Sequence, residues 1–444
     1  MHSIIQVAYS HNKIYNQTMN KLPANWKKLK IEDCADIIGG GTPSTKKKEY
    51  WDGNISWITP KDLSNYNSRY ISRGSRNISE KGLKYSSARL LPKNSVLLTT
   101  RAPIGYLAIS KKELATNQGF KSLIMKNGNV PEFFYYLLKN NIAKLLQYAS
   151  GTTFMELNAT NLKSIEFYIP EVAEQKRIAS ILSSFDDKIE LNNKTNKILE
   201  EMAQTIFEEW FINFNFPNED GKPYKKSGGE MIGSELGGIP KGWKIDIISN
   251  LFNVTIGKTP PRKEIECFSK NYKDIKWVSI SDMGNSGLFI VDTSEYLTPE
   301  AIKKYNVNVV PKNTVILSFK LTIGRVSITS EDMTTNEAIA HFNSDNNFIN
   351  EYLYFYLKNF NYRVLGNTSS IAEAINSKII KSIKIIIPKD DILNKYHNIV
   401  FDMFKKIRNN QIENQKLSGI RDSLLPKLMA GEIRIDKNFE TINF

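Results

Sequence analysis

The sequence predicts an α+β protein made of two copies of one globular unit, each followed by a long coiled-coil helix. Two segments carry this prediction, "IEFYIPEVAEQKRIASIL" (Ile165 to Leu182) and "IKIIIPKDDILNKYHNIV" (Ile383 to Val400). In each, β-branched residues end at a proline, and a charged segment with apolar residues three and four apart begins at once, which indicates a strand followed by a helix. Solenoid repeats recur about every 20–50 residues, so this wider spacing indicates duplicated domains.

The two halves also match along most of their length. The matching pairs are "LPANW" and "IPKGW", "ISWITPKDL" and "IKWVSISDM", "LPKNSVLLTTRAPIG" and "VPKNTVILSFKLTIG", and "TNQ" and "TNE". Within each half, short β-type runs between Gly, Pro and Asn turns predict a compact domain with a mixed or antiparallel sheet. We expect an extension over 1–19, globular domains over 20–170 and 241–388, a central helix over 171–215, a linker over 216–240, and a C-terminal helix and tail over 389–444.

Each long helix is predicted to carry a seam for pairing, in which apolar residues and asparagines recur alternately four and three residues apart. The seam residues are Ile178, Leu182, Phe185, Ile189, Asn192, Asn196 and Leu199 in the first helix, and Tyr396, Met403, Ile407, Asn410, Asn414 and Leu417 in the second. A buried amide is costly unless it meets a polar partner. In an antiparallel pair the asparagines would face one another and fix the register; the alternative is a solvated middle in two unrelated helices. Pro426 is expected to end the second helix.

The composition indicates a globular protein with a polyanionic partner. Hydrophobic residues make up 41% of the chain, and 60 Lys and Arg against 46 Asp and Glu leave a formal net charge of +14. Such a charge favours nucleic acid or an acidic membrane surface, although basic folds without such partners exist. No apolar run approaches the length of about 20 residues that spans a bilayer, and no export signal opens the chain. The two cysteines suit a reducing compartment, so we expect a cytoplasmic protein without a membrane partner.

Motifs for catalysis or cofactor binding are missing from the sequence. It contains neither G-x-x-x-x-G-K-[ST] nor G-x-G-x-x-G after a strand, and "IGGGTPS" is better explained as a turn than as a phosphate cradle. None of the four histidines stands near a second histidine or a cysteine at metal-ligand spacing, and His397 is expected on the surface of its helix. The sequence therefore predicts a non-catalytic chain without a metal or a cofactor of its own.

Basic and amide-bearing residues gather instead in turns of both predicted domains. They are Lys46, Lys47, Lys48, Lys61, Arg69, Arg73, Arg76, Arg101 and Gln118 in the first, and Lys258, Arg262, Lys263, Lys320, Arg325 and Asn336 in the second. Arginine and lysine suit phosphates and the guanine edge, whereas Gln and Asn suit adenine. Taken singly, each is more readily explained as a solvated surface residue; only their joint placement favours a DNA surface.

These residues and motifs resemble those of a known family, the specificity subunit of type I restriction-modification systems. The resemblance runs from about Leu22 to Ile433. Its motifs are "GGTPS", "WITPKDL", "TTRAPIG", "SGTTFMELN", "IPEVAEQKRIASIL", "EEWFINF", "SELGGIPKGW" and "RDSLLPKLMAGEI". No single motif is decisive, but in this order and in duplicate they are specific. They add Thr99 and Thr152 to the candidate DNA contacts.

The resemblance implies two target-recognition domains, each reading one half of a split site in double-stranded DNA, held apart by two long antiparallel helices. It also implies two methyltransferase subunits that carry S-adenosylmethionine, and a motor-nuclease subunit that uses ATP and Mg. The second half departs from the pattern: "NTSSIAEAIN" replaces "SGTTFMELN", Glu337 stands where the first half has Gln118, and "DDILNKYH" replaces "AEQKRIAS". The alternative functions are a divergent DNA-cleaving enzyme and a coiled-coil scaffold protein.

Overall fold

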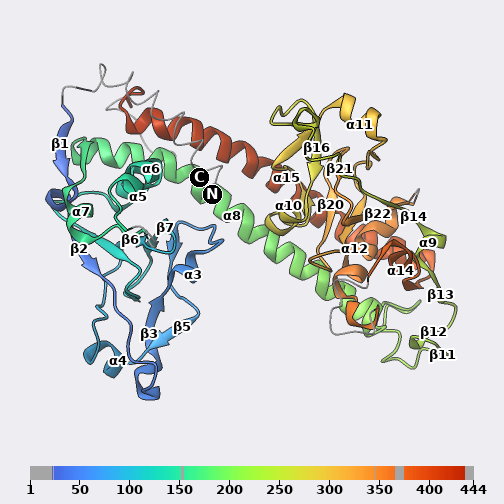
Figure 1. Ribbon diagram of the computed structural model, residues 1–444. Coiled ribbons are helices and arrows are strands. Elements are labelled where there is room, and N and C mark those ends of the chain that lie inside the picture. Colours follow the sequence, from blue (N-terminus) through green and yellow to red (C-terminus); the bar gives the residue numbers. More distant parts are fainter. Residues whose placement is uncertain (1–22, 24, 152–154, 345, 366–374, 436–444) are drawn as a thin grey trace. The chain divides into compact units, whose positions relative to one another are not determined.

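The fold is that of a computed structural model (Figure 1), which describes residues 23, 25–151, 155–344, 346–365 and 375–435. These residues form two compact units. Unit 1 comprises the described parts of Met1–Glu190 and Leu417–Phe444, and unit 2 comprises those of Leu191–Lys416. The chain passes from unit 1 into unit 2 within one long helix and returns within another. The predicted extension over 1–19 lies outside the described residues.

Unit 1 is built on a five-stranded mixed sheet in the order β2-β9-β6-β7-β4. Its strands are β2 (Ala35–Gly39), β4 (Tyr70–Ile71), β6 (Val96–Thr100), β7 (Ile104–Ser110) and β9 (Lys121–Met125). β4 pairs with β7 in parallel, and the other neighbours are antiparallel. A smaller sheet contains β5 (Arg76–Ile78), β3 (Trp51–Ile58) and β8 (Ala115–Thr116), and β1 (Lys27–Lys30) pairs with β10 (Glu166–Ile169).

An aromatic helix provides much of the core of unit 1. The helices are α2 (Ile31–Cys34), α3 (Pro60–Leu63), α4 (Glu80–Lys84), α5 (Pro131–Asn140), α6 (Ile142–Gln147) and α7 (Ala159–Ser164). α5 buries every side chain from Phe133 to Leu138, and these pack with apolar residues of the sheet and of both long helices. Burying one such side chain stabilises the fold by about 1.5–3 kcal/mol, so the long helices belong to this core.

Unit 2 repeats the main sheet of unit 1, with five strands in the order β14-β22-β19-β20-β17, and its smaller sheet has one strand more than that of unit 1. The strands are β14 (Asn253–Ile256), β17 (Phe289–Ile290), β19 (Val315–Ser318), β20 (Val326–Thr329) and β22 (Ile339–Asn343). The smaller sheet contains β15 (Phe268–Ser269), β18 (Glu295–Leu297), β16 (Ile275–Val278) and β21 (Thr334–Thr335), and β13 (Lys244–Ile247) pairs with β23 (Lys384–Ile387). The helices are α9 (Ile248–Leu251), α10 (Ile280–Asn285), α11 (Pro299–Tyr305), α12 (Asn350–Asn359) and α14 (Ser377–Lys381).

The two long helices are α8 (Val172–Phe207) and α15 (Asp390–Met429). A π-helical turn at Glu208–Ile212 extends α8, and a hairpin of β11 (Met231–Ser234) and β12 (Gly237–Pro240) follows before β13. Within unit 2, hydrogen bonds join Asn192 to Asn414, Asn196 to Asn410, and the carbonyl of Ala203 to Tyr396. Residue numbers rise along one helix as they fall along the other, so the helices are antiparallel and the predicted fold class is confirmed.

The asparagines form a hydrogen-bonded centre in this helix pair. Asn192 Nδ2 donates to Asn414 Oδ1 at 2.9 Å, and Asn410 Nδ2 donates to Asn196 Oδ1 at 2.8 Å. Asn192 Nδ2 also donates to Glu413 Oε2 at 2.8 Å. Asn192 and Asn410 occupy equivalent places in the two halves, so these two bonds are related by a local pseudo-two-fold axis. A buried amide bonded in this way specifies register.

The remaining seam residues differ in how deeply they lie. Ile178 and Leu182 are buried in unit 1, and Tyr396 and Ile407 are buried in unit 2. The half-buried residues are Phe185, Ile189, Leu199, Met403 and Leu417.

Two expectations about α15 are wrong. The helix does not end at Pro426 but continues to Met429. Leu425, Leu428 and Met429 are buried in unit 1, and the gain from their burial exceeds the cost of about 3 kcal/mol for an internal proline. His397 is not a surface residue, because its side chain is only 12% exposed and its Nδ1 lies 3.0 Å from Glu351 Oε2.

Candidate nucleic-acid interface

Four loops of unit 1 converge where strands of its two sheets end. Gly41 N–H donates to the carbonyl of Thr116 at 2.9 Å, Asn117 N–H to that of Ile58 at 2.9 Å, and Thr100 N–H to that of Gly119 at 2.8 Å. These bonds join the ends of β2, β3 and β6 to the turn between β8 and β9. We call residues 40–42, 59–61, 100–102 and 116–119 loop cluster 1.

Unit 2 contains the same arrangement. Lys258 N–H donates to the carbonyl of Thr335 at 2.9 Å, Asn336 N–H to that of Val278 at 3.0 Å, and Phe319 N–H to that of Ala338 at 2.9 Å. Each bond is the counterpart of one in unit 1. We call residues 257–259, 279–281, 319–321 and 335–338 loop cluster 2. The two units therefore share this pattern of backbone hydrogen bonds, which we call the backbone frame, but they carry different side chains on it.

One glycine in each cluster allows the backbones to approach closely. A Cβ at Gly40 would lie 2.0 Å from the carbonyl oxygen of Asn117, and one at Gly257 would lie 2.1 Å from that of Asn336. Real Cβ atoms do not come so close to backbone atoms, so only glycine fits. The glycines of "IGGG" and "IGK" therefore serve loop packing, in agreement with the interpretation of "IGGGTPS" as a turn.

A threonine hydroxyl fixes the side chain at the tip of each cluster. Thr42 Oγ1 donates to Gln118 Oε1 in unit 1, and Thr259 Oγ1 donates to Glu337 Oε2 in unit 2. Among the described residues, no other hydrogen bond engages the amide NH2 group of Gln118 or the second carboxylate oxygen of Glu337. The two units therefore present a donor and an acceptor at the same place.

The turn after the third core strand carries a cation in both units. Arg101 follows β6, and its Nη1 lies 3.9 Å from Glu156 Oε2, so the guanidinium is only loosely paired. Lys320 follows β19 and is exposed. The next residue has a positive φ in both turns, 47° at Ala102 and 61° at Leu321.

A guanidinium stacked on aromatic rings lies on the smaller sheet of each unit. Arg76 lies over Trp51 at 3.6 Å, and Arg262 lies over Phe268 at 4.2 Å and over Trp277 at 4.5 Å. Nη1 of Arg262 also donates to both carboxylate oxygens of Glu295, at 2.9 and 3.1 Å. Stacking leaves the N–H edge of a guanidinium in a defined plane for a further partner.

The other predicted contacts are placed in several ways. The exposed ones are Lys46, Lys48, Lys61, Arg73, Lys258 and Lys263. Lys47 is also exposed, and the hydrogen bond between its Nζ and the Tyr50 hydroxyl, 3.0 Å long, raises its pKa. Arg325 is half-buried and donates to the carbonyl of Ile280 at 2.5 Å, and Asn336 Oδ1 accepts from Ala338 N–H within its own turn at 3.1 Å. Thr152 lies outside the described residues.

Two predicted DNA contacts have structural roles instead. Arg69 is 4% exposed, and its guanidinium donates to the Tyr136 hydroxyl at 3.0 Å and pairs with Asp187 of α8. Thr99 is fully buried in β6, where its Oγ1 accepts from Tyr106 N–H at 2.8 Å. Neither side chain reaches the surface, so both are corrected to residues that hold the fold.

A buried histidine supports loop cluster 2. His341 Nε2 lies 2.6 Å from Thr335 Oγ1, and its Nδ1 lies 2.9 Å from Thr255 Oγ1. Burial lowers the pKa of His341 to about 4, so the imidazole is neutral at pH 7. Unit 1 has the buried Ser122 at this place. The buried residue next to the loop cluster therefore differs between the two units, although the backbone hydrogen bonds of the clusters are the same.

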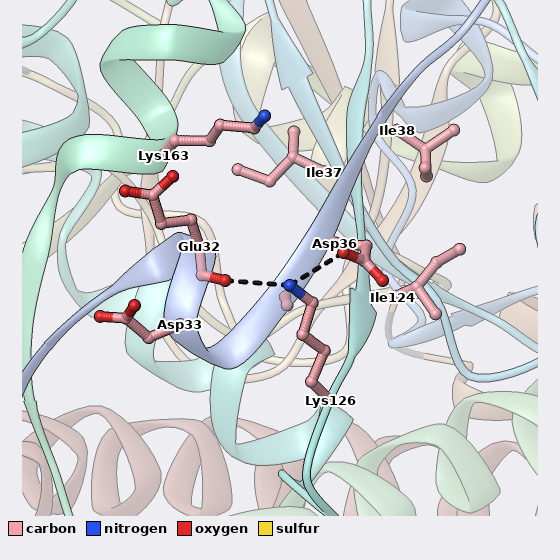
Figure 2. A pocket seen from close by; sticks show the side chains of 9 residues that line it. Glu32, Asp33, Asp36, Ile37, Ile38, Ile124, Lys126 and Lys163 are labelled. Carbon is pink, nitrogen blue, oxygen red and sulfur yellow. Dashed lines mark hydrogen bonds and ion pairs between the residues drawn. The ribbon is translucent and has the colours of Figure 1, made fainter.

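A cavity of about 500 Å³ in unit 1 lies near the start of β2 and the end of β9, away from loop cluster 1 (Figure 2). Glu32, Asp33 and Asp36 line it, and Lys126 Nζ binds the carbonyl of Glu32 at 3.1 Å and the carboxylate of Asp36 at 2.9 Å. Because lysine and acidic side chains neutralise one another here, nothing in the lining favours a phosphate.

Sequence reasoning missed two residues of the clusters, Thr42 and Thr259, and also Glu156, which pairs with Arg101 of loop cluster 1. The Thr-Pro pair at matching places in both halves was the available signal, because a threonine that recurs beside a tip residue suits a side-chain hydrogen bond.

Within the described ranges, no group of three or more His, Cys, Asp or Glu side chains is placed to hold a metal ion. No helix in the described part of the chain is long and apolar enough to cross a membrane.

Comparisons with known proteins agree with this picture. The family model described as the type I restriction modification DNA specificity domain matches residues 23–201 and 240–421. The chain is 40% identical over 431 residues to the specificity subunit of type I restriction enzyme MjaIX of Methanocaldococcus jannaschii, with 94% of this chain and 96% of that protein covered. It is 28% identical to the HindI specificity subunit of Haemophilus influenzae, over 70% of this chain and 80% of that one.

The fold is also similar to a crystal structure, that of the S subunit of a type I restriction-modification system from M. genitalium. The TM-score is 0.57 at 18% sequence identity, and the match covers 92% of this chain and 97% of the other. At this identity the similarity concerns the fold.

Proposed function

Because the chain belongs to the type I restriction-modification DNA specificity family, we propose that it reads a split site in double-stranded DNA, with one half-site assigned to each unit. It is a specificity subunit, the DNA-recognition component of such a system and not an enzyme. The target-recognition domains would comprise residues 20–170 and 241–388. A cytoplasmic location follows from the same proposal, since the DNA is there.

The observation that carries this proposal is the pair of loop clusters with one backbone frame and different tips. The free amide NH2 of Gln118 suits base acceptors such as N7 and O6, whereas the free carboxylate oxygen of Glu337 suits the amino groups of cytosine or adenine. Exposed cations around each tip would bind phosphates and set the register. Two loop clusters with different hydrogen-bonding groups at their tips would recognise two different half-sites.

The chain would work with partners that supply the chemistry. We assign S-adenosylmethionine to two methyltransferase subunits, and ATP and Mg to a motor-nuclease subunit, with no cofactor on this chain. Support for docking on α8 comes from Leu191, Ile198 and Met202, which are spaced seven and four residues apart and are 58%, 46% and 47% exposed. An apolar helix stripe of this kind suits a protein partner.

The decisive experiment is co-expression of the chain with the methyltransferase subunit of its host, followed by sequencing of methylated bases. We expect methylation only when both proteins are present, at a split motif with a fixed gap. Cleavage of DNA by the chain alone would support the divergent nuclease instead. Absence of sequence-selective DNA binding by the mixture would support the scaffold.

We expect Gln118→Glu to change the base preference of the unit 1 half-site and leave the other half-site unchanged. The substitution replaces the free NH2 donor by an acceptor while Thr42 still holds one oxygen, so a base acceptor would lose its partner. The change should cost about 1–3 kcal/mol at one base pair. Methylation of a randomised half-site library measures it, and an unaltered preference would remove Gln118 from the contacts.

We expect Arg101→Ala to weaken binding to the unit 1 half-site by about 1–3 kcal/mol if the contact is to a base, or uniformly with a smaller salt slope if it is to a phosphate. Arg101 is 3.9 Å from Glu156 and remains available. Titration of the complex on DNA at several salt concentrations distinguishes these outcomes. Lys93→Ala, at an exposed lysine outside the cluster, is the matched control. Unchanged binding with an unchanged slope would assign Arg101 to its ion pair.

A further inference from the structure

The turn between β19 and β20 presents one large apolar side chain to solvent. Leu321 is 85% exposed, which is the highest value among the large hydrophobic residues in the described part of the chain. It belongs to none of the apolar clusters in the described part of unit 2. Single exposed leucines are common on protein surfaces, so exposure alone assigns it no role.

The backbone at Leu321 is fixed in a conformation that leucine rarely adopts. Its φ is 61°, in the left-handed region that bulky residues seldom occupy. Thr322 N–H donates to the carbonyl of Lys320 at 2.6 Å, and Ser318 Oγ donates to that of Thr322 at 2.6 Å. Gly324 N–H donates to the carbonyl of Ser318 at 3.0 Å. Glycine would adopt this turn at lower cost, and strain that persists in this way points to function.

The equivalent turn of unit 1 provides an internal comparison. Ala102 also has a positive φ, 47°, and follows Arg101 as Leu321 follows Lys320. Both turns project one residue directly after a cation. The projecting side chain is a methyl group in unit 1 and an isobutyl group in unit 2. The two turns therefore offer side chains of different size to a partner at equivalent places of the two clusters.

Resting on the proposed function, we infer that Leu321 is an apolar base contact of unit 2, packed against the 5-methyl group of a thymine while Lys320 binds a neighbouring phosphate. The thymine methyl is the apolar group that base pairs display in the major groove, and aliphatic side chains recognise it. A cation on the preceding residue would hold the turn against the DNA backbone. Leu321 therefore specifies a thymine at one position of the unit 2 half-site.

The test uses the full chain in complex with the methyltransferase, and DNA duplexes that carry the motif methylated by the wild-type complex. Each thymine in the unit 2 half-site is replaced in turn by uracil, which lacks only the methyl group. We expect about fourfold weaker binding at one position, because one apolar methyl contact is lost. For the Leu321→Gly complex we expect about tenfold weaker binding to the thymine duplex and no further loss with uracil.

The variants separate contact from folding. Glycine relieves the positive φ, so Leu321→Gly should unfold at a temperature no lower than that of the wild type. Leu321→Asn suits the same backbone conformation and should also abolish the methyl dependence. Ala102→Gly makes the same backbone change in unit 1 and should leave every uracil effect in place.

Three results would overturn the inference: a unit 2 half-site without a thymine, a Leu321→Gly complex that binds like the wild type, or a uracil effect that persists in that variant. Failure of the proposed function itself is distinguishable, because the wild-type complex would then methylate no split motif, and Leu321 would lose its DNA partner with it.

Discussion

A fragment that ends near Asn215 is expected to form a homodimer that recognises an inverted repeat of the first half-site. Residues 20–215 include the first globular domain and α8, but not the end of α15 that completes unit 1. Without α15, the core that contains Ile178 and Leu182 would lose Leu425, Leu428 and Met429, at a cost of about 1.5–3 kcal/mol for each large side chain left uncovered. The fragment should therefore recruit a second copy of α8 in place of α15.

The asparagine centre makes this replacement specific. In the intact chain Asn192 bonds to Asn414, and Asn196 bonds to Asn410. Asn410 and Asn414 are the counterparts of Asn192 and Asn196, so two antiparallel copies of α8 would form the Asn192–Asn196 bond twice. A two-fold axis would then relate two identical reading domains, and the recognised site should become symmetric.

Co-expression of the fragment with the methyltransferase, mass measurement in solution and sequencing of the methylated motif test this expectation. The matched control is the fragment with Asn192→Asp and Asn196→Asp, which would bring four carboxylates together and should remain monomeric. A monomeric wild-type fragment, or a dimer that still reads the parental asymmetric site, would contradict the expectation.

Asp186→Ala is expected to have the largest effect of a single substitution on the stability of unit 1, about 3–5 kcal/mol. Asp186 is 6% exposed, accepts from the Tyr136 hydroxyl at 2.6 Å and pairs with Arg421 of α15. Removal of the carboxylate leaves a largely buried guanidinium with only the exposed Asp422 as an ionic partner, and the loss of the buried pair sets the magnitude. Burial and the nearby Asp186 carboxylate raise the pKa of Tyr136 well above its ordinary range, which keeps its hydroxyl a donor.

Hydrogen exchange read out on peptides of each unit separately measures this effect, since protection should fall in unit 1 alone. The control is Asp422→Ala, which removes an ion pair of the same Arg421 at a side chain that is 58% exposed, and exposed pairs contribute about 0–1 kcal/mol. The double variant Asp186→Leu with Arg421→Met should recover much of the loss, because it leaves no buried charge. Equal protection in wild type and Asp186→Ala would show that solvent reaches this network.

The duplication, the mixed sheets and the antiparallel helix pair could be predicted, because each produces a recognisable pattern of residues within a short stretch of sequence. A strand that ends at a proline before a helix, or two asparagines at one point of a heptad pattern, is visible within a short window. The replacement of Gln118 by Glu337 at the equivalent position of the second half was visible in the sequence as well. Only the structure shows that Thr259 donates to one carboxylate oxygen of Glu337, so that the other oxygen is the acceptor presented at the tip.

Burial by a distant segment could not be predicted. Arg69 stands among turn residues in the sequence, yet it contacts Asp187 and Glu190 of α8, more than one hundred residues later. Thr99 belongs to a motif that resembles a recognition loop, but every side chain of β6 is buried, and that of Thr99 is among them. Pro426 carries a strong local signal for a helix end, which the burial of its neighbours outweighs.

Unit 1 is assembled from the first and the last parts of the chain, and this order matters during synthesis. Unit 2 consists of consecutive residues, Leu191–Lys416, whereas unit 1 needs Leu425, Leu428 and Met429 from the end of α15. Ribosomes add about 5–20 residues per second, so the amino-terminal domain waits on the order of 10–50 s for its missing helix. A stop codon near the end of the gene would therefore damage the domain that was made first.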